Sequence, residues 1–138
     1  MVTFADADPN GLAELVGRLI ASNIERDPGR SRLLRPAVVE LSASDADIQA
    51  TIRVAPAGVS VANGPASSKP DLRVRADAYD LIELAAAPLR LGLPDVLDAR
   101  GRAVLRRIAA RHVRVSGMLA HPVRLTRFTR LLSVGAAP

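Results

Sequence analysis

The stretch GVSVANGPASSKPDLRVRADAYDLIEL, residues 58–84, decides the fold. Two short runs within it, 59–61 and 72–75, alternate apolar with polar residues, which is the period of a strand with one buried face. The segment 63–70 between them is rich in Gly, Pro and Ser, as is typical of a loop. Directly after the second run the apolar spacing becomes helical, and Asp77 is suited to cap that helix. The stretch therefore predicts strand, loop, strand and helix, whose apolar faces can meet.

The residues before this stretch predict a helix and two further strands. Asp8 and Pro9 are typical of a helix start, and apolar residues then recur at helical spacing through residue 24. The segment 30–32 predicts an exposed turn. The runs 39–43 and 48–54 alternate, and we expect them to form a hairpin with one buried face. Because only a tight turn separates this hairpin from the run at 59–61, the three strands should form an antiparallel meander.

The residues after the stretch predict an apolar loop, a strand and two helices. The segment AAAPLRLGLPDVLD, residues 85–98, is apolar, but its two prolines and its glycine prevent a continuous helix. It predicts either a lid packed over the sheet in the ordinary way or a mobile flap at the mouth of an apolar cavity. Helical spacing returns over 99–111 and 122–132, with a strand at 112–116 between them. Together the elements predict an α+β fold with five strands and four helices.

Length and composition indicate one globular domain spanning residues 1–138. The chain is long enough to bury a sizeable core, and its hydrophobic fraction of 49% is that of an ordinary folded domain. It has no cysteine, which excludes disulfides, thiolate metal sites and cysteine nucleophiles. No apolar run approaches the roughly 18 residues of a membrane span, and the first nine residues lack the basic residues of a signal peptide. We therefore expect a cytoplasmic protein.

The basic residues are unevenly distributed along the chain. Residues 1–98 carry 10 Lys or Arg and all 14 acidic residues, whereas residues 99–138 carry 9 Arg and no acid. A GC-rich genome explains the preference for Arg over Lys but not the missing acids. A surface this basic attracts anions, such as a lipid headgroup, an anionic membrane surface or nucleic acid, unless it is only solvated. The chain has only three aromatic residues for base stacking, which disfavours nucleic acid as a partner.

The sequence offers little for catalysis. It contains no Gly-rich phosphate loop, no Gly-x-Ser-x-Gly elbow and no His-Glu-x-x-His motif. The two histidines, His112 and His121, lie nine residues apart without a third metal ligand nearby, and a structural role is their simpler interpretation. Asp45 and Asp47 are explained by local hydrogen bonding in a turn. We expect no enzymatic activity, no cofactor and no metal site, while an enzyme that uses His112 or His121 stays open as an alternative hypothesis.

The order of these elements resembles the sterol carrier protein 2 family, whose members are non-specific lipid-transfer domains, over residues 12–134. The resemblance is to freestanding bacterial members, and the chain does not end in a peroxisomal signal. The parts that carry it are an edge strand at 58–61, the start Pro70-Asp71-Leu72 before a capped helix, the Val-x-Val-x-Gly strand at 113–117 and the closing Leu131–Val134. The resemblance implies a five-stranded mixed, mainly antiparallel sheet, with four helices covering one face and an apolar tunnel between. It also implies a ligand such as a fatty acid, acyl-CoA, phospholipid or sterol, and no catalytic residues.

A ligand site follows from this resemblance together with the apolar pattern. Its wall, lid and closing residues are Ile52, Val59, Val61, Leu72, Val74, Leu81, Leu84, Leu89, Leu91, Leu93, Ile108, Leu125, Phe128 and Leu132. An anionic headgroup would lie near Arg100, Arg102 and Arg106 at the tunnel mouth. The same fold also serves as an accessory domain of some bacterial enzymes and in lipid-quinone assembly factors. The alternative is therefore an interaction module whose groove is filled by protein, with the oligomeric state and the identity of any lipid left open.

Overall fold

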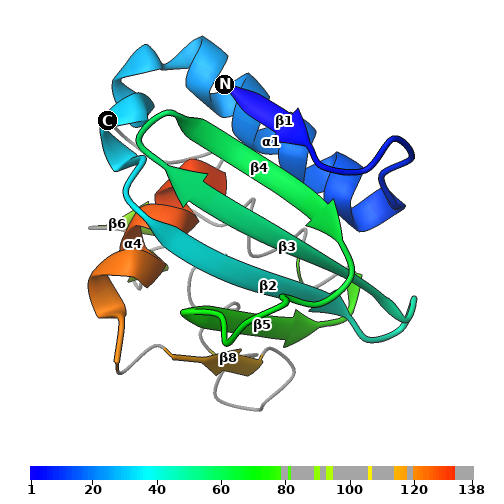
Figure 1. Ribbon diagram of the computed structural model, residues 1–138. Coiled ribbons are helices and arrows are strands. Elements are labelled where there is room, and N and C mark those ends of the chain that lie inside the picture. The colour runs from blue at the N-terminus through cyan, green and yellow to red at the C-terminus, as the bar shows by residue number, and fades with distance from the viewer. Residues whose placement is uncertain are drawn as a thin grey trace.

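The computed structural model describes residues 1–78, 81, 89–90, 93–94, 106, 114–117 and 120–132. Its main sheet has six strands in the order β1-β4-β3-β2-β5-β8 (Figure 1). These strands are β1 Val2–Phe4, β2 Ala37–Ala43, β3 Ile48–Ala55, β4 Gly58–Asn63, β5 Leu72–Ala76 and β8 Arg114–Ser116. The helices whose bounds lie within the described residues are α1 Gly11–Arg26, the 3-10 helix η1 Pro28–Leu33 and α4 Pro122–Leu132. Two short strands, β6 Leu89–Arg90 and β7 Leu93–Pro94, pair with each other within the segment predicted to be a loop.

The predicted meander is confirmed. Strands β2, β3 and β4 are antiparallel neighbours, with Val39 opposite Ile52 and Ile52 opposite Val61. Strand β5 then runs parallel to β2, and β8 runs antiparallel to β5. The chain must therefore cross from β4 past two strands to reach the other side of β2, which makes the sheet mixed, as expected.

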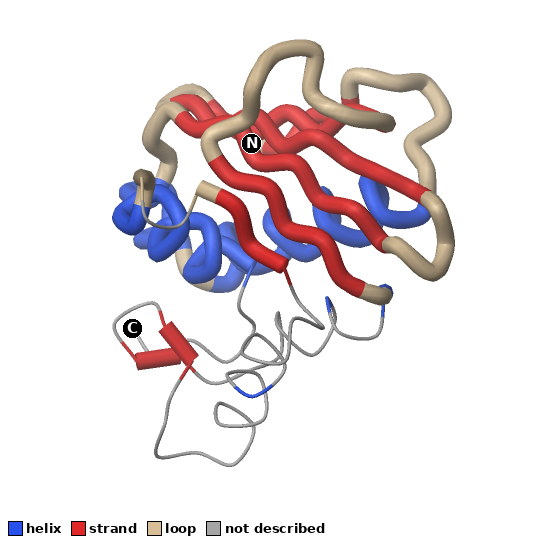
Figure 2. Tube along the Cα trace, turned by 90° about the horizontal axis from the view of Figure 1, so that it is seen from below, coloured by secondary structure: helices blue, strands red, loops and turns tan. Residues whose placement is uncertain are grey.

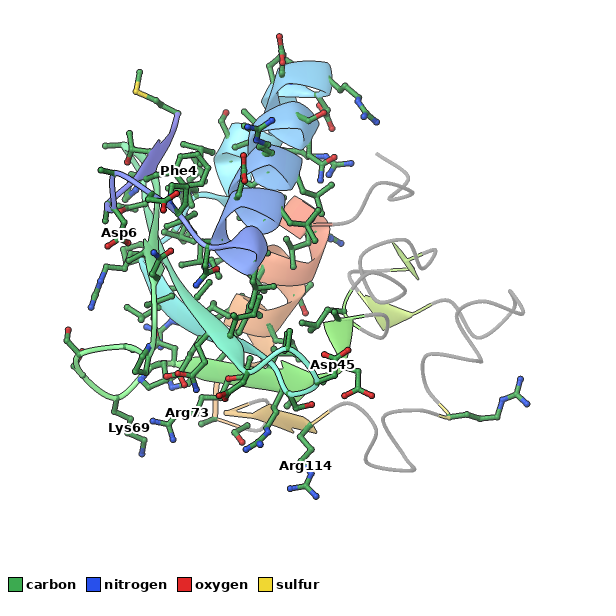
Figure 3. All side chains as sticks on the ribbon, turned by 90° about the vertical axis from the view of Figure 1, so that its right-hand side faces the viewer. Phe4, Asp6, Asp45, Lys69, Arg73 and Arg114 are labelled. Atoms are coloured by element: carbon green, nitrogen blue, oxygen red, sulfur yellow. The ribbon has the colours of Figure 1, made fainter. Side chains whose placement is uncertain are left out.

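A sixth strand at the N-terminus was missed by the sequence prediction. Strand β1 pairs in parallel with β4, and the flanking hydrogen bonds are Val59 N to Met1 O and Ala5 N to Val61 O, both 2.8 Å. The prediction that residues 58–61 form an edge strand is therefore wrong. Val2, Thr3 and Phe4 alternate as the run at 59–61 does, but no tight turn joins them to a neighbouring strand, so their strand character comes from pairing with the distant β4. The ring of Phe4 lies against Gly17 of α1, where a side chain would collide with it (Figure 3).

Helix α1 begins later than Asp8 and Pro9 predict. Its N-cap is Asn10, whose Oδ1 accepts a hydrogen bond of 2.9 Å from Ala13 N. The same side chain donates from Nδ2 to the carbonyl of Gln49 at 2.8 Å. The Asp8 carbonyl instead accepts from Asn63 Nδ2 at 3.0 Å. Asn10 N also donates to Asn63 Oδ1 at 2.8 Å, so the chain is held on β3 and β4 up to Asn10, and the helix begins directly after this residue.

Helices α1 and α4 lie on the same face of the sheet (Figures 1 and 2). Residues Leu12, Val16 and Ile20 of α1 are buried there, whereas Leu15, which the helical spacing had included, is exposed. Segment 30–32 is part of η1 rather than a simple turn, because the Asp27 carboxylate accepts from Gly29 N and starts a 3-10 helix. Of the helices predicted after residue 77 and over 99–111, only residues 78, 81 and 106 are described, and all three are helical.

The opposite face of the sheet is polar. The loop after β4 folds onto it, with Thr51 Oγ1 donating to Gly64 O at 3.0 Å and Ala66 N donating to a Glu40 carboxylate oxygen at 3.3 Å. In the parts of the chain that the structure describes, no helix lies over this face. Lys69 and Arg73 extend from it away from the helices (Figure 3). One face of the sheet is therefore apolar and covered by helices, and the other is polar, partly covered by the loop after β4, and carries the exposed side chains of Arg53, Arg73 and Arg75.

Candidate functional site

The predicted wall residues of the sheet all lie on its covered face. They are at most 3% exposed and belong to one hydrophobic cluster: Ile52, Val59, Val61, Leu72 and Val74. Strand alternation explains this placement, because residues two apart along a strand share a face and the register sets neighbouring strands side by side. Val39, Leu41 and Ala50 complete the apolar surface between them.

The predicted closing residues join the same cluster from the helix side. Leu125, Phe128 and Leu132 of α4 are buried against it, and Leu131, which was not predicted, is buried still more deeply. Leu81 is partly buried and packs on the cluster. Sheet and α4 thus contribute to one continuous apolar interior.

The structure describes only some of the remaining predicted residues. Leu84, Leu91, Ile108, Arg100 and Arg102 lie outside the described residues. Leu89 and Leu93 are described only as members of the strand pair β6 and β7, and Arg106 is exposed. The lid and the headgroup site near Arg100, Arg102 and Arg106 therefore stay predictions.

A small hollow opens where η1, the start of β2 and α4 meet. Its volume is about 10 Å³, enough for about one water-sized group. The residues that line it are Leu33, Arg35, Ala37, Val54, Arg124, Arg127, Phe128 and Leu131. It thus combines an apolar floor, continuous with the core, and a cationic rim. Sequence reasoning missed Arg35 as a site residue and treated the arginines of the last helix as a surface that is solvated or attracts lipid headgroups or, less favoured, nucleic acid.

A polar cluster beside this hollow fixes α4 to the sheet. Asp71, just before β5, accepts from Arg124 Nη1 at 3.1 Å and from Val38 N at 2.8 Å. Arg124 Nη1 also lies 2.7 Å from His121 Nδ1, while His121 Nε2 is 3.9 Å from Asp71. Because a guanidinium only donates, His121 Nδ1 accepts, and the proton of a neutral ring sits on Nε2. These contacts join the start of α4 to the segment before β5, which fits a structural role for His121.

Within the described residues, no group of three or more His, Asp or Glu side chains is arranged to hold a metal ion. His112 lies outside those residues. None of the described helices is long and apolar enough to cross a membrane.

Asn23 is a second polar residue that the sequence analysis did not single out. It is 2% exposed, and its Nδ2 donates to Leu131 O at 2.8 Å and to Leu132 O at 3.0 Å. A polar residue on the apolar side of a predicted helix was the available signal. Its amide joins α1 to the last turn of α4, so the two helices that border the interior are held together.

Comparison with known proteins indicates the class of fold. No protein-family model matches the chain, and no curated protein matches it either. Among solved structures it is similar to the UbiJ-SCP2 ubiquinone synthesis protein, with a TM-score of 0.61 at 16% identity over 88% of this chain and 92% of that one. It is also similar to the stereoselective inverting sec-alkylsulfatase Pisa1 from Pseudomonas sp., with a TM-score of 0.53 at 16% identity over 78% of this chain and 14% of that one. The chain therefore has an SCP2-like mixed α+β fold.

Proposed function

We propose that residues 1–138 form a single domain of the sterol carrier protein 2 family. This domain binds an apolar lipid between its sheet and its helices and catalyses no reaction. The observation that carries the proposal is the unbroken apolar face of β2, β3, β4 and β5, buried beneath helices in an SCP2-like fold. The proposed ligand is a fatty acid, an acyl-CoA, a phospholipid or a sterol.

The energy available from apolar burial is sufficient. Each buried methylene of an acyl chain contributes about 0.8 kcal/mol, so a sixteen-carbon chain offers roughly 12 kcal/mol before the costs of ordering and association. Micromolar binding requires about 8 kcal/mol net. An apolar cavity lined by leucine and valine is therefore adequate without polar recognition, and the lid residues Leu89, Leu91 and Leu93 are proposed to cover it.

Equilibrium unfolding tests this function. A ligand that binds only the folded chain raises the free energy of unfolding by about 2.7 kcal/mol when its concentration is one hundred times the dissociation constant. Lipid-free protein is titrated with urea in the presence and absence of palmitate, palmitoyl-CoA, a phospholipid or a sterol. We expect at least one of them to stabilise the fold. If none of the four shifts the urea midpoint, the lipid-binding proposal is wrong.

A second candidate is an accessory module whose groove is filled by protein. Two observations favour it: the tight burial of Ile52, Val61 and Leu72, and the fold shared with a protein described as a ubiquinone synthesis protein. An accessory module would associate with another subunit or with a second copy of itself. Sedimentation equilibrium over a hundredfold range of concentration tests the second case, because the mass of a self-associating chain rises with concentration whereas that of a monomeric carrier is constant.

A further inference from the structure

Exposed cationic side chains lie together on the polar face of the sheet. Because buried and exposed residues alternate along β5, Arg73 and Arg75 both point away from the helices. Arg114 of β8 is exposed and directly opposite Arg75, so it shares this face. Arg53 of β3 is exposed there as well, and Lys69 extends from the loop after β4 (Figure 3). We call these five described residues, which come from three strands and one loop, the basic strip.

The pair formed by Arg75 and Arg114 is unfavourable for the fold itself. Directly opposed residues on antiparallel strands have Cβ atoms about 4.5–5.5 Å apart, and like charges in such a pair repel each other. No described carboxylate forms an ion pair with either arginine. An anion bound between the two guanidinium groups would relieve this repulsion and accept charge-assisted hydrogen bonds from both.

The described acidic residues on this face neutralise the basic strip only in part. Glu40 of β2 lies opposite Arg73, with a carboxylate oxygen 3.7 Å from Arg73 Nε, yet the Arg73 side chain is still 61% exposed. Arg53 donates from Nη2 to Ser67 Oγ at 3.1 Å, which is a neutral partner. The strip therefore keeps a surplus of positive charge that attracts an anionic partner.

The surroundings of the strip argue against a membrane and against a second copy of this chain. Among the described residues, no large exposed apolar side chain comes from β2, β3, β5 or β8, so nothing on this face is suited to insert between lipids. Asp45 and Asp47, exposed in the turn that follows β2, would repel the headgroups of an anionic bilayer. A symmetric contact with a second copy would place arginine against arginine.

The spacing along β5 fits the carboxylates of an extended polypeptide. Arg73 and Arg75 are two residues apart, which corresponds to about 6.6–6.8 Å along a strand. Alternate side chains of an extended segment lying along β5 repeat at the same distance. The planar guanidinium group offers paired donors that match the two oxygens of a carboxylate.

We propose that the basic strip binds an extended acidic segment of a partner protein, with one carboxylate between Arg75 and Arg114 and another on Arg73. The interaction goes beyond the proposed lipid binding and does not depend on it, because the strip and the apolar interior lie on opposite faces of the sheet.

The test measures the binding of a labelled peptide, in which glutamate and serine alternate, to the full-length chain by fluorescence anisotropy at low ionic strength. R75Q/R114Q removes the opposed arginines. R18Q/R26Q is the matched control, because it removes the same charge from exposed residues of α1. The same peptide with glutamine in place of glutamate is the ligand control, and a DNA duplex and vesicles of phosphatidylglycerol are tested in parallel.

We expect R75Q/R114Q to weaken binding of the glutamate peptide about fivefold or more, R18Q/R26Q to weaken it less than about twofold, and the glutamine peptide not to bind. Because opposed cations repel each other, the urea midpoint of R75Q/R114Q should be no lower than that of the wild type. Weaker binding then does not result from unfolding.

Equal weakening by the two variants, or no binding of the glutamate peptide to the wild type, overturns the inference. A lower urea midpoint for R75Q/R114Q also overturns it, because the arginine pair would then stabilise the sheet. If R75Q/R114Q reduces binding only to the DNA duplex or only to the vesicles, the class of partner is wrong. The lipid-binding proposal survives each of these outcomes, since urea unfolding with added lipid tests it separately.

Discussion

Glycine at position 117 has a specific conformational reason. Its φ is 88°, in the region that disfavours other residues, and a Cβ there would overlap the carbonyl oxygen of Asp71. Asp71 directly precedes β5 and also binds Arg124 of α4. The Val-x-Val-x-Gly pattern thus ends with a glycine because the backbone of β5 leaves no space for a side chain.

Gly117→Ala should lower the free energy of unfolding by about 3 kcal/mol or more, since backbone strain and a backbone collision add together. Gly64→Ala is the matched control: φ at Gly64 is 82°, but no atom lies within 4 Å of the position of its Cβ. It should cost about 1 kcal/mol from conformation alone. Urea denaturation of both variants provides the measurement, and equal losses would contradict the close approach to Asp71.

Two hydrogen bonds from Asn23 connect the helices that border the apolar interior. Its buried amide donates to the carbonyls of Leu131 and Leu132, the last two residues of α4 that the structure describes. The contact joins elements more than one hundred residues apart in sequence. A buried amide with both acceptors satisfied fixes the position of one helix against the other more strictly than apolar packing does.

Asn23→Ala should therefore lower the free energy of unfolding by about 1–3 kcal/mol, because two carbonyls lose a buried donor. Ser22→Ala on the same helix changes a half-buried side chain and should shift stability by less than about 0.5 kcal/mol. Both thermal and urea unfolding should show a larger loss in the free energy of unfolding for Asn23→Ala than for Ser22→Ala. A loss from Asn23→Ala no larger than that from Ser22→Ala would mean that the amide does not hold α4.

Elements with several turns or several alternating residues were predictable from the sequence. Strands β2 to β5 and helices α1 and α4 each repeat their apolar spacing often enough to fix both type and buried face, and Ile52 and Phe128 accordingly lie in the core. The three-residue β1 has a run no shorter than the one predicted at 59–61, but its strand partner β4 is far away in the sequence, so the local pattern did not indicate the pairing. The start of α1 was also misplaced, because the hydrogen bonds of Asn10 depend on Gln49, which is distant in sequence.

For the molecule as a whole, the sequence predicted which surfaces are apolar but not which charged groups meet. The basic character of the last helix was evident, yet its partner η1 lies in the acidic first part of the chain. Nothing in the spacing around Arg35 indicates Arg127, since their proximity results from the packing of η1 on α4. The apolar wall was predictable because one strand period determines it, whereas the arginine-lined opening depends on tertiary contacts.

Native mass spectrometry of protein purified without detergent, followed by denaturing extraction, tests most directly whether the apolar interior carries a lipid. We predict an adduct of a few hundred daltons that extracts as a lipid, the mass expected of one ligand of the classes proposed. A mass equal to that of the polypeptide, with no uptake after addition of palmitate or palmitoyl-CoA, would contradict lipid binding. The SCP2-like fold would then serve a protein partner instead.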